Sequence, residues 1–168
     1  EADFCVDEKV ITVDLVRLVN SQDLIEDVID GLTHEMFHIW VGERKGDERK
    51  GSLSVDESKD QNKFGIINEG LAVLIGGQSL EKHHEKKGRK YDAKEAFDIF
   101  NKLLVSNNPD DIDRISKVGF RDMGYFYIVG YEIVSAVLKK RGIGHLREMI
   151  KNTETNYKQF FEEYFDEK

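Results

Sequence analysis

The sequence predicts an α+β domain that is mainly helical and has a small strand region near its N-terminus. From residue 21 onward, apolar residues recur at helical spacing in one segment after another. Before that point, residues 10–16 are rich in β-branched side chains, which is typical of a strand. With 168 residues and 39% hydrophobic content, the chain is large enough for one domain with one core. We therefore expect a single domain over residues 1–168, and the glutamate at position 1 leaves open that it was cut from a longer protein.

The composition restricts the classes of partner that the domain can have. Charged residues make up 35% of the chain and the formal net charge is −8, which argues against nucleic acid or an anionic membrane as partner. The single cysteine, Cys5, excludes an intrachain disulfide and a cysteine-based zinc site. No apolar run approaches the roughly 20 residues of a membrane span, and no signal-peptide pattern opens the chain. Compartment and oligomeric state stay open.

The first predicted helix follows Ser21, which can cap it, and its helical spacing continues to Trp40. His34 and His38 lie beside its apolar stripe, and Gly31 is near their face of the helix. We expect the stripe, with Trp40 in it, to face the core. The stripe consists of Leu24, Ile25, Val28, Ile29, Leu32, Met36, Ile39 and Trp40.

After this helix, residues 42–62 contain glycine, serine and charged residues with almost no apolar content, which predicts a long mobile surface loop. A second helix is expected over residues 63–84, where apolar residues again recur at helical spacing. Pro109 marks a break before one of the later helices. These later helical patterns cover residues 92–105, 110–117, 121–141, 143–151 and 155–166.

The segment His34-Glu35-Met36-Phe37-His38 carries the strongest chemical signal. Positions i and i+4 of a helix project from one face, so His34 and His38 can bind the same metal ion. Two histidines at this spacing with a glutamate after the first are typical of a zinc-hydrolase helix. Glu35 can reach a metal-bound water without being a ligand and can act as its general base. The alternative is a pair of ordinary histidines on a helix, so a third ligand is needed.

Glu69 is the best candidate for that third ligand, within Asn68-Glu69-Gly70-Leu71-Ala72. Gly70 and Ala72 are small, which permits two helices to approach closely at the metal. Two imidazoles and one carboxylate would hold one zinc ion per chain and leave a fourth position for water. The alternative for Glu69 is a surface acid on an amphipathic helix.

Several other polar residues are candidates of lower weight. Tyr125, Tyr127 and Tyr131 stand at a helix start, where a phenol could donate to a developing oxyanion. We interpret Tyr125 and Tyr131 as packing residues. We expect the pair at positions 83 and 84 to be solvated, and His145 to belong to a helix start without chemistry.

Three segments together resemble a known family. Residues 34–42, His-Glu-Met-Phe-His-Ile-Trp-Val-Gly, resemble the helix motif of the gluzincin metallopeptidases, in particular the aminopeptidase-N-like family. The glycyl-aminopeptidase family is similar too, with a phenylalanine before the second histidine as at Phe37. Residues 68–72 resemble the segment with the third zinc ligand of the aminopeptidase-N-like family, and residues 127–130 resemble the segment with its transition-state-stabilising tyrosine.

The resemblance, which covers about residues 10–151, implies a thermolysin-like metallopeptidase catalytic domain. It implies that His34, His38 and Glu69 bind zinc. It also implies that Glu35 activates the zinc-bound water and that Tyr127 stabilises the oxyanion. The substrate would be a peptide or a protein.

The sequence also departs from the aminopeptidase-N-like pattern. The segment between His38 and Glu69 is longer, no Gly-x-Met-x-Asn segment precedes His34, and Val129 replaces a lysine. The choice between aminopeptidase and endopeptidase therefore stays open. Two further alternatives remain: a non-catalytic, zinc-containing binding or scaffold module with a gluzincin fold, and hydrolysis of a non-peptide amide or epoxide at the same site.

Overall fold

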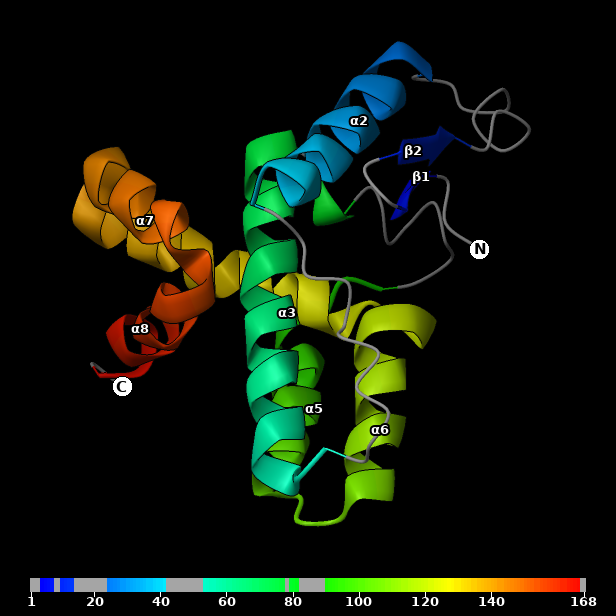
Figure 1. Ribbon diagram of the computed structural model, residues 1–168, viewed down its shortest axis with the longest axis vertical. Helices are drawn as coiled ribbons and strands as arrows, with labels where there is room; N and C mark the ends of the chain where they lie inside the picture. Colours follow the sequence, from blue (N-terminus) through cyan, green and yellow to red (C-terminus); the bar gives the residue numbers. More distant parts are fainter. Residues whose placement is uncertain are drawn as a thin grey trace.

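The computed structural model describes residues 4–7, 10–13, 24–41, 53–77, 79–81 and 90–166, and the chain is mainly helical (Figure 1). Two short strands, β1 (Phe4–Asp7) and β2 (Val10–Val13), pair in antiparallel fashion. Strand β2 covers the described part of the strand expected at residues 10–16. Among the helices in the described ranges, none combines the length and apolar character that crossing a membrane requires.

The order of helices agrees with the apolar periodicity along most of the chain. The helices expected at 92–105, 110–117 and 155–166 correspond to α5, α6 and α8. Pro109 is the first residue of α6, a position where its missing N–H group is not needed. The helical elements are α2 (Leu24–Val41), α3 (Val55–Gly76), α5 (Ala93–Val105), α6 (Pro109–Lys117), the short π-helix η1 (Val118–Asp122), α7 (Tyr125–Lys151) and α8 (Thr153–Phe165).

The two helices expected at 121–141 and 143–151 together form α7, which is interrupted at Gly142. Gly142 has a φ of 79°, a conformation that glycine adopts without a steric penalty. The break separates the two predicted helices at the expected place. The N-terminal boundary differs, because residues 118–122 form η1 and α7 begins only at Tyr125.

Helix α3 is the central element of the fold. It packs against α2, α6, α7 and α8. In Figure 1 it stands upright, with α2 across its upper end and the yellow first turns of α7 passing behind it. Its C-terminal half is apolar on almost every side, as expected for a helix that is covered all round. The side chains of this half without exposed surface are Ile66, Ile67, Leu71, Ala72 and Val73.

The prediction of a surface loop over residues 42–62 is wrong for residues 55–62, which form the first turns of α3. Ser54 explains this early start. Its hydroxyl accepts a hydrogen bond from the Glu57 N–H group, and the Glu57 carboxylate accepts one from the Ser54 N–H group. This capping box starts a helix whose first turns are hydrophilic and solvent-facing. The helix ends at Gly76 rather than near residue 84, while residues 42–52 and 82–84 lie outside the described residues.

The apolar stripe of α2 does not face the core of the described structure. Ile25, Met36 and Trp40 are 76%, 60% and 67% exposed. The expectation that Trp40 is a core residue was therefore wrong. Periodicity identifies which residues share a face of a helix but not which face is buried. On α2 the buried residues are Gly31, His34, Phe37 and His38.

Candidate metal centre

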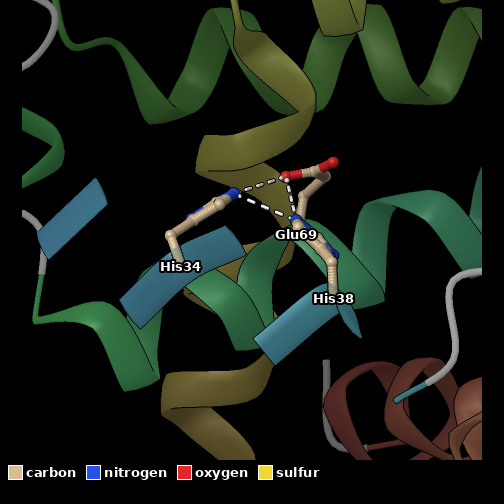
Figure 2. A group of neighbouring side chains, drawn as sticks. All are labelled: His34, His38 and Glu69. Carbon is tan, nitrogen blue, oxygen red and sulfur yellow. Dashed lines mark hydrogen bonds and ion pairs between the residues drawn. The ribbon is translucent and has the colours of Figure 1, made fainter. Parts of the chain in front are cut away.

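Helices α2 and α3 bring together the three residues predicted as metal ligands. His34 and His38 project from successive turns of α2, and Glu69 projects toward them from α3 (Figure 2). One ligand atom from each residue lies within 4.8 Å of the other two. The cluster combines two side chains from one helix with one side chain from a second helix that is distant in sequence.

The ligand atoms form a nearly equilateral triangle. The Nε2 atoms of His34 and His38 are 3.1 Å apart. The Oε2 atom of Glu69 lies 3.2 Å from Nε2 of His34 and 3.4 Å from Nε2 of His38. Tetrahedral zinc with bonds of about 2.0–2.1 Å places neighbouring ligand atoms about 3.3 Å apart. The triangle therefore has the dimensions that one zinc ion requires.

Burial and charge also suit a cation at this position. The side chains of His34, His38 and Glu69 are only 9%, 4% and 17% exposed. Burial raises the pKa of the Glu69 carboxyl, but the neighbouring His34 and His38 outweigh burial and lower that pKa to about 2. Glu69 is therefore an anion at neutral pH, and its Oε2 atom has no aligned hydrogen bond from the described residues.

A comparison with known proteins also indicates a zinc site. The family described as "Putative zinc dependent peptidase (DUF5700)" matches residues 2–166. The chain belongs to this family. No curated protein and no solved structure matches the chain. The family description and the donor set agree, since the His-His-Glu cluster of this DUF5700 chain fits one zinc ion.

Asn68 holds one of the two histidines of the DUF5700 cluster, a contact that the sequence interpretation missed. Its buried side-chain amide faces Nδ1 of His38 at 3.0 Å, with Nδ2 as the donor in this orientation. The Oδ1 atom of Asn68 then has no partner among the described residues. Rotating the amide by 180° would let Oδ1 accept from an Nδ1–H group and leave Nε2 free to bind a metal. Its place directly before Glu69 was the only signal in the sequence.

Tyr127 lies against the other histidine. Its ring stacks on the His34 imidazole at a centroid distance of 6.4 Å and an interplanar angle of 20°. Nδ1 of His34 has no hydrogen-bond partner among the described residues, so on the Nδ1 side no polar contact accompanies this stacking. Tyr127 thus lies beside the cluster, and its role as an oxyanion donor stays a prediction. Glu35 follows His34 on α2 and is partly exposed.

The remaining candidate residues take no part in the cluster of described residues. Tyr125 is buried in the core and Tyr131 packs against it, which agrees with their interpretation as packing residues. Burial and the nearby Glu95 raise the pKa of Tyr125 to about 12. His145 faces Glu163 of α8. The histidines at positions 83 and 84 lie outside the described residues.

Proposed function

We propose that this chain is a zinc metallopeptidase of the gluzincin type, with a thermolysin-like catalytic domain, that hydrolyses peptide bonds. In this proposal His34, His38 and Glu69 hold one zinc ion, Glu35 is the general base, and Tyr127 stabilises the oxyanion. The observation that carries the proposal is the triangle of ligand atoms, with sides of 3.1, 3.2 and 3.4 Å. The family's description as a zinc-dependent peptidase supports the substrate class.

A zinc ion held by His34, His38 and Glu69 would act as a Lewis acid toward the peptide carbonyl and would lower the pKa of the attacking water to about 7. The Glu35 carboxylate accepts a proton from the water as its oxygen attacks the carbonyl carbon. When the C–N bond breaks, Glu35 returns that proton to the leaving amine, which balances the reaction. Glu35 suits this role because it stands between the ligand histidines in sequence and is not itself a member of the cluster.

Tyr127 would contribute through its phenol. As the carbonyl carbon becomes tetrahedral, negative charge develops on the carbonyl oxygen, and an O–H donor placed there stabilises it. The stacking of the Tyr127 ring on His34 keeps this donor next to the cluster. Removing one such donor typically lowers kcat by about 10²–10³-fold.

The proposal is tested with fluorogenic peptides that have free or blocked amino termini, using wild type and Glu35→Gln. We expect the wild type to bind one zinc ion and to cleave members of the panel. Glu35→Gln should keep the zinc and lose hydrolysis, because the amide cannot accept the proton. Zinc content is measured by elemental analysis and cleavage by fluorescence.

Each outcome of this panel separates the competing functions. Cleavage of blocked peptides indicates an endopeptidase, and cleavage of free peptides alone indicates an aminopeptidase. Zinc binding without cleavage by the wild type would favour the non-catalytic module. If Glu35→Gln still cleaves at the wild-type rate, Glu35 is not the general base.

A further inference from the structure

Helices α3 and α7 touch through their backbones at Gly70 and Gly130. A Cβ atom added to Gly70 would lie 2.2 Å from the carbonyl carbon of Gly130. A Cβ atom added to Gly130 would lie 2.0 Å from the carbonyl oxygen of Ile66. Heavy atoms that are not bonded do not approach so closely, so no side chain larger than hydrogen fits at either position without moving a helix.

This contact lies close in sequence to two residues of the proposed site, the metal ligand Glu69 and the oxyanion donor Tyr127. Gly70 follows Glu69 on α3, and Gly130 is three residues after Tyr127 on α7. Both residues lie within one helical turn of the contact, so the separation of the helix axes there governs how far the backbones of Glu69 and Tyr127 lie from each other. In Figure 1 the first turns of α7 cross behind α3.

A second, looser glycine contact lies where α3 meets α2. A Cβ atom added to Gly76 would lie 3.2 Å from the carbonyl oxygen of Asp30 and 3.5 Å from the backbone nitrogen of His34. This contact borders a predicted metal ligand rather than Tyr127. An added methyl group here requires a shift of only a few tenths of an ångström.

We propose that Gly70, Gly130 and Gly76 are positioning residues, and that the two glycine contacts of α3 set two parts of the site separately. The contact of Gly70 with Gly130 sets the reach of the Tyr127 phenol toward the reacting carbonyl. The contact of Gly76 with α2 sets the place of His34 in the ligand triangle. This inference rests on the proposed function.

The first contact is tested by a double-mutant cycle of Gly130→Ala and Tyr127→Phe, using the panel peptide that the wild type cleaves fastest. We expect Gly130→Ala to lower kcat by about 10²-fold, close to the loss of an oxyanion donor. If Gly130 acts through Tyr127, the double variant loses no more than Tyr127→Phe alone. If the two residues act independently, the fold-loss in kcat of the double variant instead equals the product of the two single losses, to within about twofold.

The second contact is tested by Gly76→Ala. We expect its zinc affinity, measured by competition with a chromogenic chelator, to fall about tenfold, as for other changes next to a ligand. Its kcat at saturating zinc should stay near the wild-type value. Gly65→Ala is the matched control on α3, because its Cβ atom would meet only the tip of the Phe120 ring at 3.0 Å. It should change neither kcat nor zinc affinity.

The outcomes separate this inference from the proposed function. A wild type that neither binds zinc nor cleaves peptides overturns both. An active wild type with multiplicative losses in the cycle, or with unchanged zinc affinity in Gly76→Ala, overturns the inference alone. If a thermal melt shows that Gly130→Ala is unfolded, the Gly76→Ala variant decides whether the inference stands. The inference requires that Gly76→Ala binds zinc more weakly while its kcat at saturating zinc is unchanged.

Discussion

The described structure contains two clusters in which histidine faces a glutamate, and they differ in what surrounds the carboxylate. In the metal centre, the buried Glu69 faces His34 and His38. In the second cluster, between α7 and α8, Glu163 lies 3.0 Å from Nε2 of His145. Both carboxylates have a lowered pKa, so a histidine–glutamate contact by itself does not identify a metal site.

The second cluster differs because N–H groups of neighbouring side chains already contact the Glu163 carboxylate. The Gln159 amide donates to Oε1 of Glu163 at 2.8 Å, and Nε of Arg141 lies 3.5 Å from Oε2. A cation would have to displace these donors, and the guanidinium already supplies the positive charge. In the metal centre three ligand atoms converge and no arginine or lysine contacts Glu69 among the described residues. The two clusters therefore differ in that the metal centre has converging electron-pair donors without an N–H cation among the described contacts.

The largest expected difference between the clusters is in zinc affinity. Glu69→Gln should weaken zinc binding by more than about 10²-fold, since even partners outside the ligand set typically contribute 10–100-fold. The matched change Glu163→Gln should leave zinc affinity unchanged. Titration of both variants with a competing chelator measures the difference. Equal affinities of the two variants would contradict the assignment of Glu69 as a ligand.

Removal of zinc should destabilise the wild type. A ligand at about 1,000 times its Kd adds roughly 4 kcal/mol to the free energy of unfolding, which corresponds to a Tm shift of about 10 °C for a chain of this length. We therefore expect EDTA to lower the Tm of the wild type and of Glu163→Gln alike. Glu69→Gln should not respond, and a response as large as that of the wild type would point to a metal elsewhere.

Asn68→Ala should have an intermediate effect on zinc affinity, because Asn68 orients His38 without being a ligand. We expect a loss of about 10–100-fold. Asn62→Ala is the control, since Asn62 is another amide of α3, at the margin of burial, and donates to the Ser58 carbonyl instead of a histidine. Its zinc affinity should be that of the wild type. A similar loss in both variants would show that the effect comes from α3 as a whole.

The smallest effect is expected in the second cluster, where Glu163→Gln should lower the free energy of unfolding by about 1–2 kcal/mol at pH 7. Burial raises the pKa of Glu163, but Gln159, His145 and Arg141 outweigh it and hold the pKa below its ordinary value of 4.5. A carboxyl with a lowered pKa stabilises the fold above its unfolded pKa, and this stabilisation disappears as the pH falls through the folded pKa. Denaturant melts should therefore converge for wild type and variant in acid. A constant difference down to pH 2 would contradict this explanation.

The sequence alone located most of the elements and the members of the metal cluster. The spacing of His34 and His38 and the segment around Glu69 predicted a cluster that the described structure brings together. The helices α5, α6 and α8 were predictable because apolar periodicity and a proline in the first turn, as at Pro109, are local properties. The start of α3 was missed because a capping box at Ser54 outweighs the low apolar content after it.

Only the tertiary structure decided which face of each helix is buried and which backbones touch. The sequence marks an apolar stripe on α2, but α2 buries the face with His34 and His38 and leaves Trp40 exposed. The sequence marks Gly70 as small, yet its partner is Gly130 of α7, a residue far along the chain. Asn68 is one polar residue among many until it is found against His38. Such facts depend on contacts between distant segments, whereas composition and periodicity report only on neighbours along the chain.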